Sequence, residues 1–194
     1  DYGLDNGILG TKLLRALLAN KSIDVNITFE ELNKDFKKNL IICGTNITLG
    51  KAEYFNFKNN PNMKVLDAIK ISTSFPFIYT PVKYKENLYI DGGLLSPYPI
   101  DYFKNTNELI GFLIHRETEL VSVYDTSSIE KYYGSLLNIV LDSYLEKFYK
   151  GHENLTVLLN KNELTNNSMD FSICKKEKNY LLIKGQDFFK KFYE

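Results

Sequence analysis

The stretch Tyr89–Pro99, which reads YIDGGLLSPYP, restricts what this chain can fold into more than any other part of the sequence. An apolar strand predicted over Asn87–Ile90 runs directly into the carboxylate of Asp91, and Gly92 and Gly93 follow it. In α/β proteins the strand ends are where ligands bind and chemistry takes place. Two consecutive glycines allow unusual backbone angles and let another group approach the main chain closely. Asp-Gly is also a common turn dipeptide, so this stretch by itself predicts either an active-site loop or a plain turn.

Amphipathic helices alternate with short apolar strands along the chain, which predicts an α/β domain with a largely parallel sheet. The apolar run Leu109–Ile114 is typical of a strand that is buried on both faces. A hairpin is expected from the strand at 40–46 and its partner at 52–57. Predicted helices occupy residues 8–18, 29–37, 64–73, 129–150 and 180–193, and a further buried strand occupies residues 155–159. No interdomain linker is evident, and we expect one domain over residues 1–194.

Two of the predicted helices have sequence patterns from which specific contacts are expected. Thr28 and Glu31 form a capping-box pattern, in which the Thr oxygen accepts the amide of Glu31 and the Glu side chain reaches back. The longest predicted helix, Ile129–Lys150, has an apolar stripe that we expect to pack inward. Its members are Tyr133, Leu136, Leu137, Val140, Tyr144 and Phe148.

Composition excludes several classes of function. Lys plus Arg equals Asp plus Glu, 24 each, so the chain lacks the basic excess that nucleic-acid binding requires. No apolar run approaches the roughly 18 residues of a membrane span. We expect no metal, because the cysteines and histidines lack ligand spacing, and no cofactor, because GxxxxGK[ST] and GxGxxG are absent. Cys43 and Cys174 are far apart and typical of reduced thiols in an intracellular protein.

The other residues with catalytic potential stand in weak contexts. His115 and His152 could each serve as a base, but a lone histidine without placed partners is more often structural. Ser135 is predicted inside a helix and not on the strained strand-to-helix elbow that a serine nucleophile needs.

Five segments, colinear over roughly residues 3–115, follow known sequence motifs. Gly3–Gly7 with the following Leu13-Leu14 resembles "GLYDG…LxxLL", Ile42–Phe55 resembles "TATDLxTGKxxxF", Ala68–Pro76 resembles "AIRASxAxP", Phe77–Val82 resembles "FFPV", and Tyr89–Pro99 resembles "YVDGGxxxNxP". Each match is weak alone, but in this order and at this spacing the segments resemble the patatin-like phospholipase family.

The resemblance implies a three-layer α/β/α sandwich with a mainly parallel central sheet, truncated at its N-terminus and completed by residues 116–194. It also implies a Ser-Asp dyad without histidine, in which Asp91 is the base and Gly92 and Gly93 shape its loop. The family's GxSxG serine and its glycine-rich oxyanion loop are absent from these 194 residues. We therefore expect the missing N-terminal segment of the same protein as a partner. This chain alone is expected to be inactive, because nucleophile and oxyanion donors each contribute orders of magnitude to the rate.

The implied substrate is a lipid or phospholipid ester, and peripheral contact with a membrane is in keeping with it. An acyl groove is expected from Phe75, Phe77, Ile78 and Tyr79. The lysines at 175, 176, 178, 190 and 191 could touch a membrane surface, although charged runs more often form a solvated face. We expect an intracellular location, cytoplasmic or peripheral on membranes.

One departure from the family pattern supports a second interpretation. Pro97 stands where the family has Asn, and Ser96 can replace that side chain only in part. With the missing elbow, this departure leaves a catalytically inactive patatin-like module that binds lipid or a protein partner as the alternative to a hydrolase.

Overall fold

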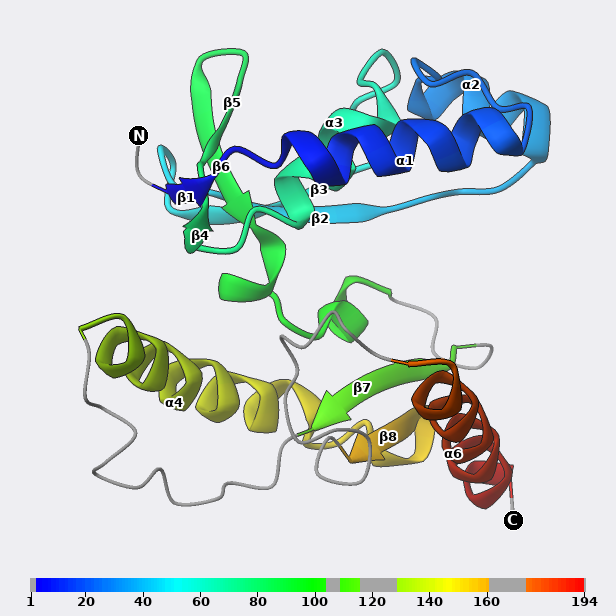
Figure 1. Cartoon of the computed structure of the whole chain (residues 1–194), viewed down its shortest axis with the longest axis vertical. Helices are drawn as coiled ribbons and strands as arrows, with labels where there is room; N and C mark the ends of the chain where they lie inside the picture. The colour runs from blue at the N-terminus through cyan, green and yellow to red at the C-terminus, as the bar shows by residue number, and fades with distance from the viewer. Residues whose placement is uncertain (1–2, 104–108, 116–128, 161–173, 194) are drawn as a thin grey trace. The chain divides into compact units, whose positions relative to one another are not determined.

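The computed structural model describes residues 3–103, 109–115, 129–160 and 174–193, and they form a mixture of helices and strands (Figure 1). This confirms the predicted α/β class. The chain divides into two compact units, Asp1–Pro97 and Tyr98–Glu194. The organisation of residues 1–194 as one domain stays a prediction.

The first unit alternates between strands and helices along the sequence. Its largest sheet has the strand order β3-β2-β6-β5, and β1 pairs separately with β4. The elements are β1 (Gly3–Asp5), α1 (Ile8–Asn20), α2 (Phe29–Phe36), β2 (Ile42–Asn46), β3 (Lys51–Phe55), α3 (Val65–Ser72), β4 (Phe77–Tyr79), β5 (Val82–Tyr84), β6 (Asn87–Asp91) and the short 3-10 helix η1 (Gly92–Leu94).

The four-stranded sheet differs from the mainly parallel sheet that we predicted. All of its neighbouring strands are antiparallel, whereas the pairs β1–β4 and β7–β8 are parallel. For β2–β3 and β5–β6 the reason is the short connection, because a short turn reverses the chain and a parallel pair needs a longer crossover. β2 and β6 are also antiparallel, although β3, α3, β4 and β5 lie between them in the sequence. β2 and β3 form the expected hairpin, with Gly50 in its turn at a φ of 64°.

The core of the first unit lies between α3 and the four-stranded sheet. Ala68 and Ile71 of α3 are fully buried, and so is Phe55 of β3. A Cβ atom on Gly44 of β2 would lie 2.6 Å from a methyl carbon of Ile71, so a glycine is what lets the helix approach the strand this closely. Buried Phe29 and Met63 extend the same cluster toward α2.

The second unit is built on the parallel pair β7–β8. Its elements are the 3-10 helix η2 (Pro99–Tyr102), β7 (Gly111–His115), α4 (Ile129–Tyr149), the 3-10 helix η4 (Glu153–Leu155), β8 (Thr156–Asn160) and α6 (Lys175–Tyr193). Its core cluster contains buried Tyr98, Ile100 and Leu113, against which the C-terminal part of α4 packs. Figure 1 shows α6 lying beside β8, with which it is in contact.

Two predictions about burial in this unit are wrong. The strand at 109–114 was expected to be buried on both faces, yet Phe112 and Ile114 are 58% and 59% exposed while Leu113 is buried. The α6 helix packs on β8, which leaves these two side chains of β7 uncovered among the described residues.

The apolar stripe of α4 also does not pack inward along its whole length. Tyr133, Leu136 and Val140 are exposed, whereas Phe148 packs against the core cluster. A helix of 21 residues is roughly 32 Å long. A strand of five residues covers roughly 17 Å, so the first half of α4 extends past the pair it packs on.

None of the described helices combines the length and the apolar character that crossing a membrane requires.

The capping box at the start of α2 is confirmed. The amide of Glu31 donates to Thr28 Oγ1 at 3.2 Å, and the amide of Thr28 donates to the Glu31 carboxylate at 2.8 Å. These reciprocal bonds satisfy amides that a helix start otherwise leaves unpaired.

We predict that Thr28→Ala lowers the free energy of unfolding by about 1 kcal/mol, the usual contribution of an N-cap hydroxyl. Urea denaturation followed by circular dichroism measures the change. Glu30→Gln, at an exposed position in the same helical turn, is the matched control and should stay within about 0.5 kcal/mol of the parent. Equal stability of Thr28→Ala and the parent would contradict the capping role.

Candidate active site

Asp91 is the last residue of β6 and the N-cap of η1, so it stands where the strand ends and the chain turns. Its backbone is held from two sides. In the sheet it lies opposite Gly44 of β2, and its amide donates to the carbonyl of Ser74, after α3, at 3.0 Å. The carboxylate is therefore placed at the junction between the four-stranded sheet and the end of α3.

The two glycines are needed for close approach. A Cβ atom on Gly92 would lie 2.5 Å from the carbonyl oxygen of Cys43, so only glycine fits against this part of β2. A Cβ atom on Gly93 would lie 3.0 Å from Asp91 Oδ1. Neither glycine has a positive φ, so of the two glycine properties considered from the sequence, close packing is the one used here.

The Asp91 carboxylate is half-buried and bound at one oxygen. Asp91 Oδ1 accepts a hydrogen bond from the Gly93 amide at 2.7 Å. Burial raises the pKa of Asp91 above its ordinary value of 3.8, and the Gly93 hydrogen bond opposes the rise. Among the described residues, no side-chain hydroxyl donates to the carboxylate, and its second oxygen is left to accept a proton from another group.

Two serines whose backbones bond to the Asp91 segment, Ser74 and Ser96, have hydroxyls that are hydrogen-bonded to other groups. Ser74 Oγ donates to the Lys70 carbonyl at 2.6 Å, as is common for a serine near a helix end. Ser96 Oγ lies 2.8 Å from the hydroxyl of Tyr54. The described residues thus contain a candidate base, and none of their serine hydroxyls is hydrogen-bonded to its carboxylate.

Tyr54, Ser96 and Cys43 form a cluster beside the Asp91 loop that was not predicted from the sequence. Burial raises the pKa of Cys43 to about 11, hydrogen bonding to Ser96 opposes the rise, and the negative charge of Asp91 adds to it. Part of the cluster could have been predicted from the register of the hairpin, which places Tyr54 opposite Cys43. The position of Ser96 had no such signal.

The four predicted groove residues fall in different environments. Phe75, Ile78 and Tyr79 are half-buried, whereas Phe77 is 62% exposed and adopts a φ of 68°. The segment around Phe77 was expected to be a linker, but part of it pairs with β1 as the strand β4. A groove role for these residues stays a prediction.

A cavity of about 230 Å³ lies within the first unit between α1, the end of α3 and β4. Tyr79 is the one predicted groove residue in its lining, and Ser74, whose carbonyl holds Asp91, lines it as well. Its remaining walls come from polar and apolar residues of the α1 region and from Lys70, Thr73 and Thr80. The cavity therefore adjoins the backbone that supports Asp91.

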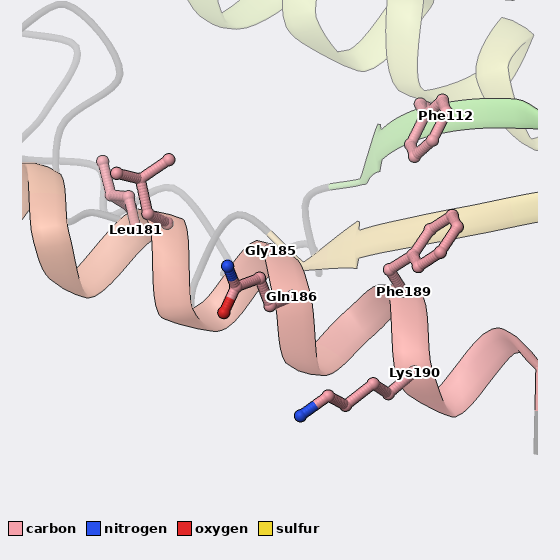
Figure 2. Close-up of a pocket in the computed structure, with 7 residues that line it drawn as sticks. Phe112, Leu181, Gly185, Gln186, Phe189 and Lys190 are labelled. Atoms are coloured by element: carbon pink, nitrogen blue, oxygen red, sulfur yellow. The ribbon is translucent and has the colours of Figure 1, made fainter.

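A second hollow, in the second unit, has an apolar character. It measures about 490 Å³ and lies between β7 and α6, with Phe112 on one side and Leu181 and Phe189 on the other (Figure 2). Figure 2 shows Gln186 and Lys190 as the polar side chains in the lining. They do not form an acid–base pair, so this hollow has no evident catalytic set.

The two histidines lie in the second unit. His115 ends β7, and His152 Nε2 lies 2.9 Å from Asp101 Oδ1, which joins the η2 segment to the chain after α4. Ser135 lies inside α4, as expected. In the part of the chain that the structure describes, no three His, Cys, Asp or Glu side chains gather as they would around a metal ion.

Comparison with known families identifies the group of proteins to which this arrangement belongs. A family model described as "Patatin-like phospholipase" matches residues 3–104, which include the Asp91 loop. The chain belongs to the patatin-like phospholipase family. This confirms the resemblance drawn from the five segments, and it places the chain in a family of lipid hydrolases.

Two viral proteins are similar to this patatin-like chain. A "Probable lipid hydrolase" of Invertebrate iridescent virus 6 is 33% identical over 177 residues, covering 81% of the chain. An uncharacterized protein of Acanthamoeba polyphaga mimivirus is 28% identical over 187 residues, covering 93% of the chain. The chain spans 61% of the length of each relative.

Among solved structures, VipD from Legionella pneumophila is similar with a TM-score of 0.53 and 15% sequence identity. The match covers 86% of this chain and 35% of VipD. At this identity the likeness shows the fold, which is the patatin-like α/β fold.

The raised pKa of Cys43 leads to a prediction about thiol reactivity. Because a thiolate is the reactive form, Cys43 should be alkylated slowly at pH 8, whereas the exposed Cys174 should react readily. Iodoacetamide labelling followed by mass spectrometry of the peptides measures both rates. In a Cys174→Ser variant the remaining labelling should rise with pH up to about 11. Labelling of Cys43 at the rate of Cys174 at pH 8 would show that the thiol is not shielded.

Proposed function

We propose that this chain is the aspartate-bearing part of a lipid acyl hydrolase in which Asp91 is the general base of a Ser-Asp dyad. The observation that carries the proposal is the state of the Asp91 carboxylate. It lies at a strand end, is half-buried, is tied at Oδ1 by Gly93 and has an oxygen left to accept a proton. The serine belongs to a part of the protein outside these 194 residues.

In the proposed reaction, Asp91 accepts the proton of the serine hydroxyl while the serine oxygen attacks the carbonyl carbon of a lipid ester. The bond to the alcohol breaks, the alcohol leaves with the proton that Asp91 took up, and an acyl-enzyme forms. Water then attacks the acyl-enzyme while Asp91 accepts a proton from it, and Asp91 returns that proton to the serine oxygen as the fatty acid is released. Burial favours this role because a base is most effective when its pKa lies near the working pH.

We predict that Asp91→Asn in the full-length protein lowers kcat for ester hydrolysis by about 10²- to 10⁴-fold, the usual contribution of a general base. The parent's rate should rise with pH as Asp91 loses its proton, with a midpoint above the ordinary value of 3.8 because the pKa is raised. Hydrolysis of a p-nitrophenyl ester across the pH range measures both. Asp35→Asn, at an exposed position in α2, is the control and should behave as the parent. An unchanged rate in Asp91→Asn would refute the dyad.

The alternative is a patatin-like module that binds lipid or a partner protein without catalysis. It is favoured by Pro97 in the loop and by the absence of GxSxG from these residues. A fluorophosphonate probe separates the two, because it reacts with an activated serine. Labelling of the full-length protein supports the hydrolase, and a failure to label supports the binding module.

A lipid substrate also implies contact with a membrane surface, and α6 is the element suited to it. Its exposed side combines lysines with large apolar side chains, an arrangement typical of helices that lie in the interface of anionic membranes. The exposed residues are Lys175, Lys176, Lys178, Lys190, Leu182, Ile183 and Phe189. We propose that the protein works inside the cell as a peripheral membrane protein through this side of α6, in place of the purely solvated face that lysine runs usually form.

We predict that the chain sediments with vesicles that contain phosphatidylglycerol and much less with vesicles of phosphatidylcholine alone. Replacing Lys175, Lys176 and Lys178 with glutamine should lower the bound fraction, since each lysine near an anionic surface contributes about 1 kcal/mol. Replacing Lys34, Lys37 and Lys38, which are exposed around the end of α2, is the matched control. Equal sedimentation of both triple variants would indicate that α6 has no special role.

A further inference from the structure

The loop that carries Asp91 is held at both of its ends, and at the far end it is held by the side chain of Ser96. Ser96 is only 7% exposed, and its Oγ lies 2.8 Å from the hydroxyl of Tyr54 on β3. The two residues are 42 positions apart in the sequence, so the bond joins the loop to a separate part of the fold. The Ser96 hydroxyl is buried, where a polar group without a partner is unfavourable, and the half-buried Tyr54 hydroxyl is one of its partners. The Cys43 thiol is hydrogen-bonded to both hydroxyls.

The near end of the loop is held by packing. Gly92 lies against the backbone of Cys43, and Cys43 is paired with Tyr54 across the hairpin. Inside the loop, the Ser96 amide donates to the Gly92 carbonyl at 2.9 Å and so closes the turn between the two anchors. Both anchors therefore rest on the same β2–β3 hairpin.

Attachment at both ends restricts a loop whose two glycines would otherwise leave it flexible. Two successive glycines have more backbone freedom than any other pair, and a base must be held within a fraction of an ångström of its proton donor. The Gly93 hydrogen bond restrains the Asp91 side chain only as long as the Gly93 amide is itself in place. An anchor beyond the glycines supplies that restraint from outside the loop.

We infer that the Tyr54–Ser96 hydrogen bond is a clamp that positions Asp91 for catalysis. Neither residue touches the reacting atoms in the proposed reaction, so both are positioning residues. The clamp fastens the end of the Asp91 loop to β3, keeps the Gly93 amide on Asp91 Oδ1 and leaves the other carboxylate oxygen directed at its proton donor. This inference rests on the proposed function, because it assigns the clamp to the same site.

The experiment is a double-mutant cycle in the full-length protein with Tyr54→Phe, Ser96→Ala and the two combined. Tyr54→Phe removes a hydroxyl and preserves the ring, so it tests the clamp even if Ser96→Ala disturbs folding. Each single variant should lower kcat about tenfold with KM within about twofold of the parent, the effect of losing one buried hydrogen bond. The double variant should be little worse than either single variant, because both remove the same interaction. Tyr84→Phe, on strand β5 at the opposite edge of the same sheet, is the matched control and should keep the parent kcat.

Hydrogen exchange supplies a readout that does not depend on activity. The Gly93 amide should exchange about tenfold faster in Tyr54→Phe and Ser96→Ala, because its acceptor is held less often. Unchanged exchange in both variants, or faster exchange with unchanged kcat, overturns the clamp. So does a double variant whose loss in kcat is the full product of the two single losses.

The failure of this inference is distinguishable from the failure of the proposed function. If Asp91→Asn abolishes hydrolysis while Tyr54→Phe and Ser96→Ala keep the parent kcat, the clamp is wrong and the dyad stands. If Asp91→Asn keeps the parent rate, the dyad itself is wrong, and the positioning role falls with it.

Discussion

The contact between Gly92 and the backbone of Cys43 is the constraint on which the arrangement of the site depends. A side chain at position 92 would meet the Cys43 carbonyl at 2.5 Å, which is closer than real carbon and oxygen atoms approach. The loop after β6 can therefore lie down on β2 only because this residue is glycine. Once it lies there, Asp91 is half-buried at the junction between the sheet and the end of α3, and Ser96 comes within reach of Tyr54. The burial of the Asp91 carboxylate and the Tyr54–Ser96 hydrogen bond both depend on this one close approach.

The same burial has opposite consequences for the two titratable groups beside this contact. For Asp91 a raised pKa brings the carboxylate closer to the range in which a base works. For Cys43 a pKa of about 11 keeps the thiol protonated at neutral pH, so it packs as a small apolar side chain. The neighbouring hydroxyls of Ser96 and Tyr54 partly offset the effect on Cys43. One environment thus raises the pKa values of both groups, which suits the base proposed at Asp91 and leaves the Cys43 thiol unreactive.

The two units differ in how completely their apolar residues are covered. In the first unit, α3 and the four-stranded sheet enclose a continuous cluster around Phe55 and Ile71. In the second, the parallel pair β7–β8 leaves Phe112 and Ile114 exposed within the described residues, and half of α4 extends beyond it. Parallel sheets in general are covered on both faces, and such pairs are stable as parts of larger sheets. The catalytic proposal draws on the first unit and the membrane proposal on the second.

Local features were predictable from the sequence because they depend on residues that are close along the chain. The capping box at Thr28, the β2–β3 hairpin, the bounds of α1 and the position of Asp91 at a strand end all belong to this group. The family itself was recognisable for a related reason, since its motifs are short segments whose order survives in the sequence.

Tertiary structure decided whatever depends on partners far away in the chain. The antiparallel order of the largest sheet, the pairing of β4 with β1 and the exposure of the apolar stripe on α4 could not be read from periodicity. Periodicity shows that one face is apolar, and the neighbouring elements decide how much of that face is covered. The Tyr54–Ser96 bond is of the same kind, because it joins residues that only the folded hairpin brings together. The sequence by itself determined which residue carries the carboxylate, and the fold decided how that carboxylate is buried, tied and held, because those properties depend on groups that come near it only when the chain has folded.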